Sequence, residues 1–213
     1  MKLHGYFRSS AAFRVRIALN LKGLAYENAF VHLRKGDQRG AEYLGLNPQA
    51  LVPTLEHGPH ALTQSLAIIE YLDESHPSPA LLPKTPHERA RVRALAQIVA
   101  CDIHPIDNLR VLQYLAKELK ADEAAVGRWF NHWIATGFGG LEATLAKDPA
   151  TGRFCHGDAP GLADVCLVPQ VFNSRRYSLD LSPYPTIRRI HDACMALPAF
   201  DAAQPSEQPD AEP

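Results

Sequence analysis

Hydrophobic and polar residues follow two different periods along the first eighty residues of the chain. The segments with strand character are residues 2–7, 25–33 and the two halves of 51–65, and those with helical character are 9–23, 65–77 and a short piece of the polar loop 34–48. The order of these segments predicts a small α/β layer structure.

Helical spacing within residues 9–23 divides the side chains into an inward and an outward group. Val15, Ala18, Leu19 and Leu21 are expected to face inward, and Arg14, Arg16 and Lys22 to face solvent. Gly23 suits the end of this helix, because glycine readily adopts the left-handed conformation found there.

A proline-rich segment separates the α/β region from a region whose patterns are almost wholly helical. Pro77–Pro86 holds four prolines in ten residues and is typical of a linker. Helical periodicity then runs through residues 122–148, 161–176, 184–197 and 87–120, the last as one long helix or as two parted near Pro105. The end of the chain has no apolar periodicity. We therefore expect an α/β domain at 1–82, an all-helical domain at 88–202 and a disordered tail at 203–213.

Composition narrows the class of protein. The chain has 213 residues, 46% of them hydrophobic, and a formal net charge of −1. Without a long basic run, nucleic-acid binding is disfavoured, and no apolar stretch reaches the roughly 18–20 residues of a membrane span. The four cysteines are scattered, without the close pairing of zinc or redox sites. We expect a cytoplasmic protein with free thiols and no metal.

The turn between the first strand and the first helix carries Arg8, Ser9 and Ser10, and no cysteine. Hydroxyl residues before a helix are most often plain helix caps. The same helix start also offers unpaired N–H groups and the positive end of the helix dipole, which would stabilise a thiolate. The turn is therefore either an ordinary cap or a site for a sulfur that comes from outside the chain.

Four stretches resemble the cytosolic glutathione transferases, from Met1 to about Phe200. They read SSAAFRVRIAL, NPQALVPTL, LTQSLAIIEYL and CDIHPIDNLRVLQYL. The first and the last of them resemble the zeta class in particular, and the two in between are common to glutathione transferases in general. The resemblance implies an α/β thioredoxin-like N-terminal domain, an all-α C-terminal domain, glutathione as cofactor and a homodimer. The residue after the two serines is often cysteine in this family and is Ala11 here, so the nucleophilic sulfur would belong to glutathione.

The resemblance implies specific glutathione contacts in the α/β domain. Ser9 would face the sulfur, with Ser10 supporting it or capping the helix, and Arg8 would stand beside them. Val52, before a proline expected to be cis, would pair its backbone with the cysteinyl part. Gln64 and Ser65 would hold the γ-glutamyl carboxylate at a helix start, which could otherwise be an ordinary cap. Gln38 would contact the glycyl end.

The stretch CDIHPIDNLR gathers polar residues that, without context, would form a solvated helix surface. His104 and Asn108 are four residues apart and share a helical face if Pro105 permits it. The resemblance assigns Asp102, His104 and Asn108 to glutathione, partly across a dimer interface. Cys101, turned by about 100° from Asp102, should then face the helical core.

Three arginines are expected to hold the substrate. The resemblance implies that Arg8, Arg110 and Arg176 meet carboxylates, for which guanidinium is well matched, while Arg175 faces outward. It also places a folding motif at the start of a buried helix, where Asp164 is present but the usual Ser or Thr cap is Gly161.

The activity implied is glutathione-dependent cis–trans isomerisation of a small dicarboxylate keto acid, maleylacetoacetate or maleylpyruvate. One alternative is a glutathione transferase that conjugates or dehalogenates small α-haloacids, which would use the same thiolate and arginines. A second is a glutathione-transferase-like interaction module without catalysis. Such modules tend to lose the thiolate-stabilising hydroxyl and the substrate arginines, whereas Ser9, Arg110 and Arg176 are present here.

Overall fold

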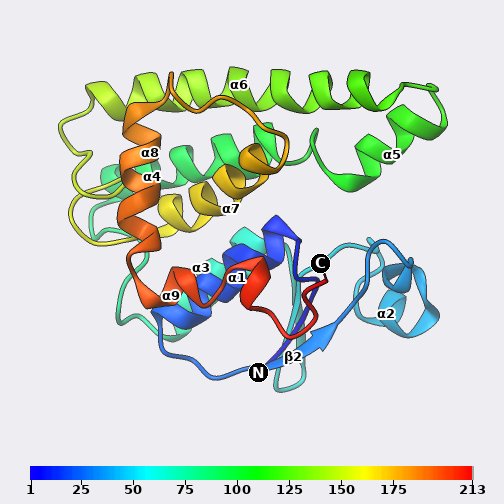
Figure 1. Cartoon of the computed structure of the whole chain (residues 1–213). Coiled ribbons are helices and arrows are strands. Elements are labelled where there is room, and N and C mark those ends of the chain that lie inside the picture. The colour runs from blue at the N-terminus through cyan, green and yellow to red at the C-terminus, as the bar shows by residue number, and fades with distance from the viewer. Residues whose placement is uncertain (213) are drawn as a thin grey trace. The chain divides into compact units, whose positions relative to one another are not determined.

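The first eighty residues form a four-stranded sheet with helices, as their periodicity predicts. The computed structural model describes residues 1–212 and has the strand order β2-β1-β3-β4. The strands are β1 (Lys2–Gly5), β2 (Glu27–Phe30), β3 (Thr54–His57) and β4 (His60–Thr63). β1 pairs parallel with β2 and antiparallel with β3, which pairs antiparallel with β4. The helices are α1 (Ser10–Leu21), η1 (Asp37–Arg39), α2 (Ala41–Leu46) and α3 (Ser65–Ser75) (Figure 1). This confirms the thioredoxin-like α/β layer.

α1 is buried around its whole circumference, and the expectation that its three basic residues face solvent is wrong. Arg14, Arg16 and Lys22 are 1%, 3% and 8% exposed. Each is hydrogen-bonded, as buried charges must be. The Lys22 ammonium, for example, contacts Asp73 Oδ1 at 2.8 Å and the carbonyls of His76 and Pro79 at 2.7 and 2.8 Å. The helical period predicted that one face of α1 would be exposed to solvent. In the structure, α3 and the end of the chain pack against α1.

The end of the chain is ordered, so the predicted disordered tail is wrong. The chain from Met195 onward belongs to the first unit, with residues 1–81, and not to the helical one. It contains α9 (Pro198–Asp201) and η3 (Pro205–Glu207), and Ala203 is fully buried. Arg16 Nε donates to the Ala203 carbonyl at 3.0 Å. Pro213, the last residue of the predicted tail, lies outside the described residues.

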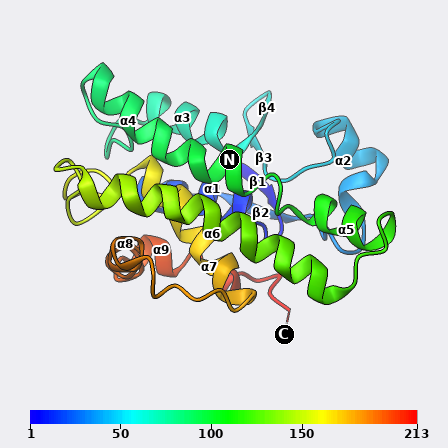
Figure 2. The same ribbon diagram turned by 90° about the horizontal axis from the view of Figure 1, so that it is seen from above.

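The second unit, Leu82–Cys194, is all-helical, as predicted. Its elements are α4 (Pro86–Gln97), η2 (Ile98–Ile103), α5 (Leu109–Lys117), α6 (Glu123–Lys147), α7 (Leu162–Arg176) and α8 (Pro185–Met195). α4 packs against α7, and the long α6 packs against η2 (Figure 2). Phe130, Ile134, Phe138, Leu141 and Leu145 recur on one face of α6 and are buried. None of the helices within residues 1–212 is both long and apolar enough to cross a membrane.

The stretch 87–120 is divided near Pro105, and it contains a widened helical turn. η2 is π-helical, and the His104 N–H donates to the Val99 carbonyl five residues earlier, at 2.9 Å. This changes the angular spacing of side chains, because a π turn holds more residues than an α turn. Cys101 is exposed, as is Asp102, so the expectation that Cys101 faces the core is wrong. Gly137 of α6 allows the close approach of η2, since a Cβ there would collide with Ile103.

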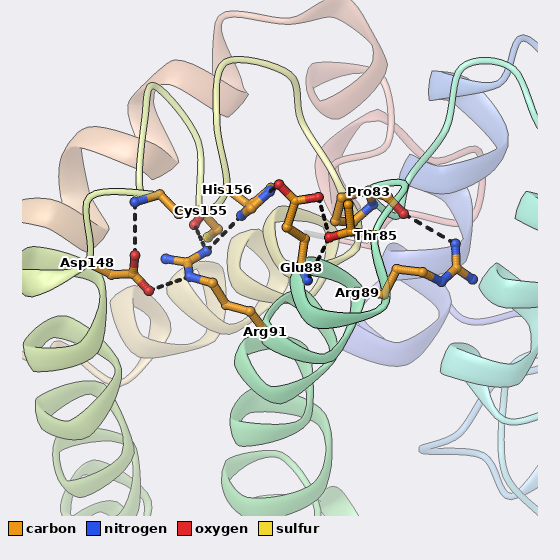
Figure 3. A network of polar contacts seen from close by, with 9 residues as sticks. Pro83, Thr85, Glu88, Arg89, Arg91, Asp148, Cys155 and His156 are labelled. Atoms are coloured by element: carbon orange, nitrogen blue, oxygen red, sulfur yellow. Dashed lines mark hydrogen bonds and ion pairs between the residues drawn. The ribbon is translucent and has the colours of Figure 1, made fainter.

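Arg91 anchors α4 to the loop that leads to α7 (Figure 3). Its guanidinium contacts Asp148 Oδ2 at 2.6 Å, the Cys155 carbonyl at 2.8 Å and Thr151 Oγ1 at 2.8 Å. At the start of α7, the buried Asp164 carboxylate accepts the N–H groups of Gly161 and Cys155 at 2.9 and 2.8 Å. In a capping box, two residues cap each other's backbone N–H groups with their side chains. Asp164 caps the Gly161 N–H, whereas Gly161 has no side chain to return the hydrogen bond.

Candidate functional site

Ser9 caps the start of α1. Its Oγ accepts a hydrogen bond from the Ala12 N–H at 3.2 Å, and its N–H donates to the Tyr6 carbonyl at 2.9 Å. Because a hydroxyl has one proton and two lone pairs, accepting from Ala12 leaves the Ser9 proton available to an acceptor outside the helix. Ser10 is the first helical residue and is 5% exposed, so the cap is Ser9 and not Ser10.

The turn before Ser9 adds a positive group to the positive end of α1. The Arg8 guanidinium lies 4.8 Å from the centre of the Phe7 ring. Burial raises the pKa of the neighbouring Tyr6 hydroxyl, and Arg8 opposes that rise. Tyr6 therefore stays neutral at physiological pH. The helix dipole and Arg8 together favour an anion, such as a thiolate, at this turn.

Val52 packs near this turn and leaves backbone hydrogen-bonding groups available to a ligand. The Val52–Pro53 bond is cis, which confirms the prediction. Tyr43 and Asn47 both donate to the preceding carbonyl of Leu51, at 2.6 and 2.7 Å. Within residues 1–212, no hydrogen bond is made by the Val52 N–H or C=O. Val52 can thus present one donor and one acceptor to the peptide bond of a ligand.

The start of α3, at Gln64 and Ser65, is a second position that favours an anion, and we call it the Gln64–Ser65 corner. Gln64 has φ 68° and ψ 114°, a conformation that residues with side chains rarely adopt and that is found at functional sites. Its Nε2 donates to Gln49 Oε1 at 2.9 Å. Arg14 Nη1 donates to Ser65 Oγ at 3.3 Å, so a buried guanidinium contacts the first residue of a helix whose dipole already favours a carboxylate.

Gln38 presents an acceptor. Its Nε2 donates to the Leu33 carbonyl at 3.3 Å, while its Oε1 is buried and makes no hydrogen bond with any residue that the structure describes. A carboxylate cannot donate to that oxygen, whereas an amide N–H can. Because this oxygen is buried, it would have to become exposed to accept from a ligand, and the ligand group that it could accept from is an N–H and not a carboxylate.

The residues expected to bind glutathione in the first unit are brought together. Tyr6 and Phe7 of the Ser9 turn pack in one apolar cluster with Val31, Tyr43 and Val52, and Leu33 borders the same cluster. The Arg14–Ser65 contact joins α1 to the Gln64–Ser65 corner. The Ser9 turn, the Val52 peptide group and the Gln64–Ser65 corner are therefore connected within one packed unit.

In the second unit, the predicted residues are spread over separate backbone elements. Asp102 lies in η2, His104 follows it, and Asn108 caps α5 by accepting the Arg110 N–H at 3.2 Å. His104 and Asn108 do not share a helical face, because η2 ends at Ile103, before Pro105, and α5 begins only at Leu109. Asn108 Oδ1 is thus already occupied by the helix cap.

One turn of α6 holds the two segments that carry Arg110 and Arg176, the arginines of this unit expected to meet substrate. Trp129 Nε1 donates to the Ile106 carbonyl at 2.9 Å, and Asn131 Nδ2 donates to the Tyr177 carbonyl at 3.0 Å. Ile106 precedes the first turn of α5, which contains Arg110, and Tyr177 follows Arg176, the last residue of α7. Both arginines are exposed.

Comparison with known proteins matches this geometry to one family. A family model described as "Glutathione S-transferase, N-terminal domain" matches residues 8–75. A maleylpyruvate isomerase from Ralstonia sp. is 54% identical over 210 residues, which cover 99% of each chain. A solved structure of maleyl pyruvate isomerase, described as a bacterial glutathione S-transferase in the zeta class, has 53% identity and a TM-score of 0.98 over 100% of both chains. The chain belongs to the zeta-class glutathione transferases.

A second solved relative contains a ligand in its active site. Maleylacetoacetate isomerase from Anaeromyxobacter dehalogenans 2CP-1 was solved with bound dicarboxyethyl glutathione and citrate in the active site. It is 46% identical to this zeta-class chain, with a TM-score of 0.87 over 100% of this chain and 97% of that one.

Asp107 is a feature of this zeta-class chain that sequence reasoning missed. It is 5% exposed, and neither carboxyl oxygen has a hydrogen-bond partner among the residues described. Burial raises its pKa to about 8, so it is mostly protonated at neutral pH. Such groups cluster at functional sites. Asp107 lies inside the CDIHPIDNLR motif, and its burial could not be predicted there because it depends on a break in the helix whose position the sequence left open.

Proposed function

We propose that the chain is a glutathione-dependent cis–trans isomerase that converts a maleyl keto acid to its fumaryl isomer. The observation that carries the proposal is the start of α1, where Ser9 caps the helix and keeps a proton to donate. The relatives described as maleylpyruvate and maleylacetoacetate isomerases support it.

The Ser9 hydroxyl, the α1 dipole and Arg8 each favour a thiolate over a neutral thiol. Together they lower the pKa of the thiol of bound glutathione. When bound, glutathione supplies the thiolate that adds to the conjugated cis double bond, allows rotation about the resulting single bond and is released with the trans product. The Val52 peptide edge and the Gln64–Ser65 corner hold glutathione at its two ends.

Arg8, Arg110 and Arg176 hold the carboxylates of the substrate and stabilise the charge that moves onto its keto group. A dicarboxyethyl glutathione is the kind of thioether that forms when a thiol adds to an unsaturated dicarboxylic acid, and its presence in a relative's active site supports this chemistry. Asp102, His104 and Asn108 remain proposed glutathione contacts, with Asn108 acting through atoms that the α5 cap does not use.

Product analysis tests the proposal. Purified protein is incubated with maleylpyruvate and with maleylacetoacetate, with and without glutathione, and both the trans product and total glutathione are measured. We expect trans product only when glutathione is present, with no net glutathione consumed. Failure to isomerise either acid would overturn the proposal.

The same assay separates the two alternatives. Halide release from an α-haloacid would favour the dehalogenating transferase, especially with glutathione consumed. Glutathione binding without turnover of any of these compounds would favour an interaction module. We also propose that the protein works as a homodimer in the cytoplasm, for which sedimentation at several concentrations is the direct test of assembly.

A further inference from the structure

The peptide groups on both sides of Phe7 are held by partners from outside the turn. The Phe7 N–H donates to Asp210 Oδ2 at 3.0 Å, across a separation of 203 residues. The Phe7 carbonyl accepts from Arg16 Nη2 at 3.0 Å. Phe7 itself is 3% exposed. The segment that leads into Ser9 is thus fixed by one carboxylate and one guanidinium.

Arg16 joins this turn to the end of the chain. While Nη2 holds Phe7, Nε of the same guanidinium donates to the Ala203 carbonyl at 3.0 Å. Burial lowers the pKa of Arg16 to about 10, which still leaves it charged at neutral pH. A charged and planar donor therefore fixes the distance between the turn and the chain end.

The chain end is itself held in shape where it meets the turn. Gln208 Nε2 donates to the carbonyls of Ala202 and Gln204, at 3.0 and 2.8 Å. Beyond Asp210, Glu212 Oε1 lies 2.7 Å from His32 Nε2, and the His32 ring is 5.1 Å from the ring of Tyr6. The segment therefore contacts Phe7 directly, through Asp210, and Tyr6 through the ring of His32.

We propose that Asp210 and Arg16 are positioning residues for the thiol site, an inference that rests on the proposed function. Only Arg8 lies between Phe7 and Ser9, and the Ser9 N–H is bonded to the Tyr6 carbonyl. A shift of the Phe7 peptide therefore moves both Ser9 Oγ and Arg8. A donor displaced by about 1 Å from a developing charge loses much of its effect.

The direction in which the pKa of the bound thiol changes distinguishes two possible roles of Asp210: positioning Ser9, or acting only through its negative charge. Asp210 is an anion near the thiol site, and its removal by electrostatics alone would favour another anion and lower the pKa of the bound thiol. Loss of the correct Ser9 position would instead raise that pKa, because the thiolate loses a donor. The two effects have opposite signs, so one titration distinguishes them.

The experiment compares four variants of the full chain with the wild type. Asp210→Ala removes the acceptor, Asp210→Glu keeps the charge but moves the carboxylate, and Asp210→Asn keeps an acceptor oxygen without the charge. Glu207→Ala is the matched control, since Glu207 is an exposed acid in the same segment. The pKa of bound glutathione is titrated by thiolate absorbance, and hydrogen exchange is followed at the Phe7 amide.

We expect Asp210→Ala and Asp210→Glu to raise the bound thiol pKa by about one unit, with roughly tenfold slower turnover and faster exchange at Phe7. Asp210→Asn should leave the thiol pKa unchanged or lower it slightly, and Glu207→Ala should change nothing. Melting curves identify any variant that fails to fold. Asp210→Glu decides the test if Asp210→Ala does not fold.

A thiol pKa that is unchanged or lowered in both Asp210→Ala and Asp210→Glu would overturn the proposal, even if exchange at Phe7 becomes faster. The titration needs only glutathione binding. If the wild type binds glutathione but isomerises neither maleyl acid, the proposed function fails while the positioning role is still tested.

Discussion

The two units present their candidate binding groups in opposite ways. In the first unit, the groups are helix starts, a cis peptide edge and arginines buried beneath them. In the second unit, the proposed substrate arginines are exposed, and α5 buries none of its nine residues. Backbone groups fixed by packing give a site one geometry, whereas long exposed side chains supply charge and can adapt.

This contrast suggests that the two halves contribute differently to catalysis. Small changes of geometry in the first unit should alter the chemistry of the thiol. Changes in the second unit should alter the capture of a dicarboxylate. On the proposed function, a fixed glutathione site combined with an adaptable acid site would also fit a family whose members are named for two different maleyl acids.

Ser9→Ala should have the largest effect on the glutathione half. Without the hydroxyl donor, the pKa of bound glutathione should rise and kcat should fall roughly a hundredfold or more, comparable to the loss of an oxyanion donor. Thiolate absorbance and steady-state rates measure the two effects. The helix also loses its cap, at about 1 kcal/mol, so melting must be monitored.

Two controls sharpen the Ser9 experiment. Ser9→Thr keeps both the hydroxyl and the cap and should retain most activity, whereas Ser10→Ala should change the thiol pKa far less than Ser9→Ala. Equal thiol pKa values in Ser9→Ala and the wild type would remove Ser9 from the mechanism.

Arg110→Ala and Arg176→Ala should affect the other half. Each should lower kcat/KM for the keto acid roughly tenfold to a hundredfold, since a charged hydrogen bond to a carboxylate contributes about 1.5–3 kcal/mol. Glutathione affinity should not change. Arg175→Ala is the matched control, because its contact with Asp192 is exposed and 3.9 Å long. A collapse of glutathione binding would show that the comparison assigns these arginines to the wrong half.

Asp107→Asn should stabilise the protein near neutral pH. The folded pKa of about 8 lies above the unfolded value of 3.8, so the folded state holds the extra proton between these values and stability falls as pH rises through that window. The variant cannot ionise and should therefore be more stable than the wild type at pH 7, a gain that shrinks as the pH falls and vanishes below about pH 4. Denaturant unfolding across pH measures it. Parallel pH profiles for variant and wild type would contradict a buried neutral acid.

Replacing all four cysteines should have the smallest effect on rate. Burial raises the thiol pKa of Cys155 and Cys194, which makes them poor nucleophiles, and Cys166 is also buried. The rate with saturating glutathione should stay within about twofold on folded protein, with any loss confined to stability. A hundredfold fall traced to the exposed Cys101 would contradict a borrowed sulfur.

Local signals in the sequence were sufficient to predict the backbone features of the first unit's candidate site. A strand period, a serine before a helix, a Val-Pro step and a Gln-Ser step each act within a few residues, and the predicted cis bond and both helix starts are present. The roles assigned to Arg8, Val52 and Ser65 stay predictions, because they depend on a bound ligand.

Long-range contacts account for the expectations that failed. Arg16 is polar and sits at a position that the helical period leaves outside, yet a segment nearly 190 residues away covers it. That segment has no periodicity of its own and is ordered by buried Ala203 and by Gln208. The π turn before Pro105 likewise has no local signature in the sequence, and its last residue, Ile103, packs against Gly137, which lies 34 residues further along the chain.

The bond between the Phe7 amide and Asp210 also has a consequence for biosynthesis. A ribosome adding about 5–20 residues per second needs roughly 10–40 s to cover the 203 residues between the two partners. Through that interval, the strand and helix around Ser9 exist without the carboxylate that completes their turn. The turn before Ser9 can therefore be completed only after the ribosome has added residue 210, a step that comes long after the turn itself is made.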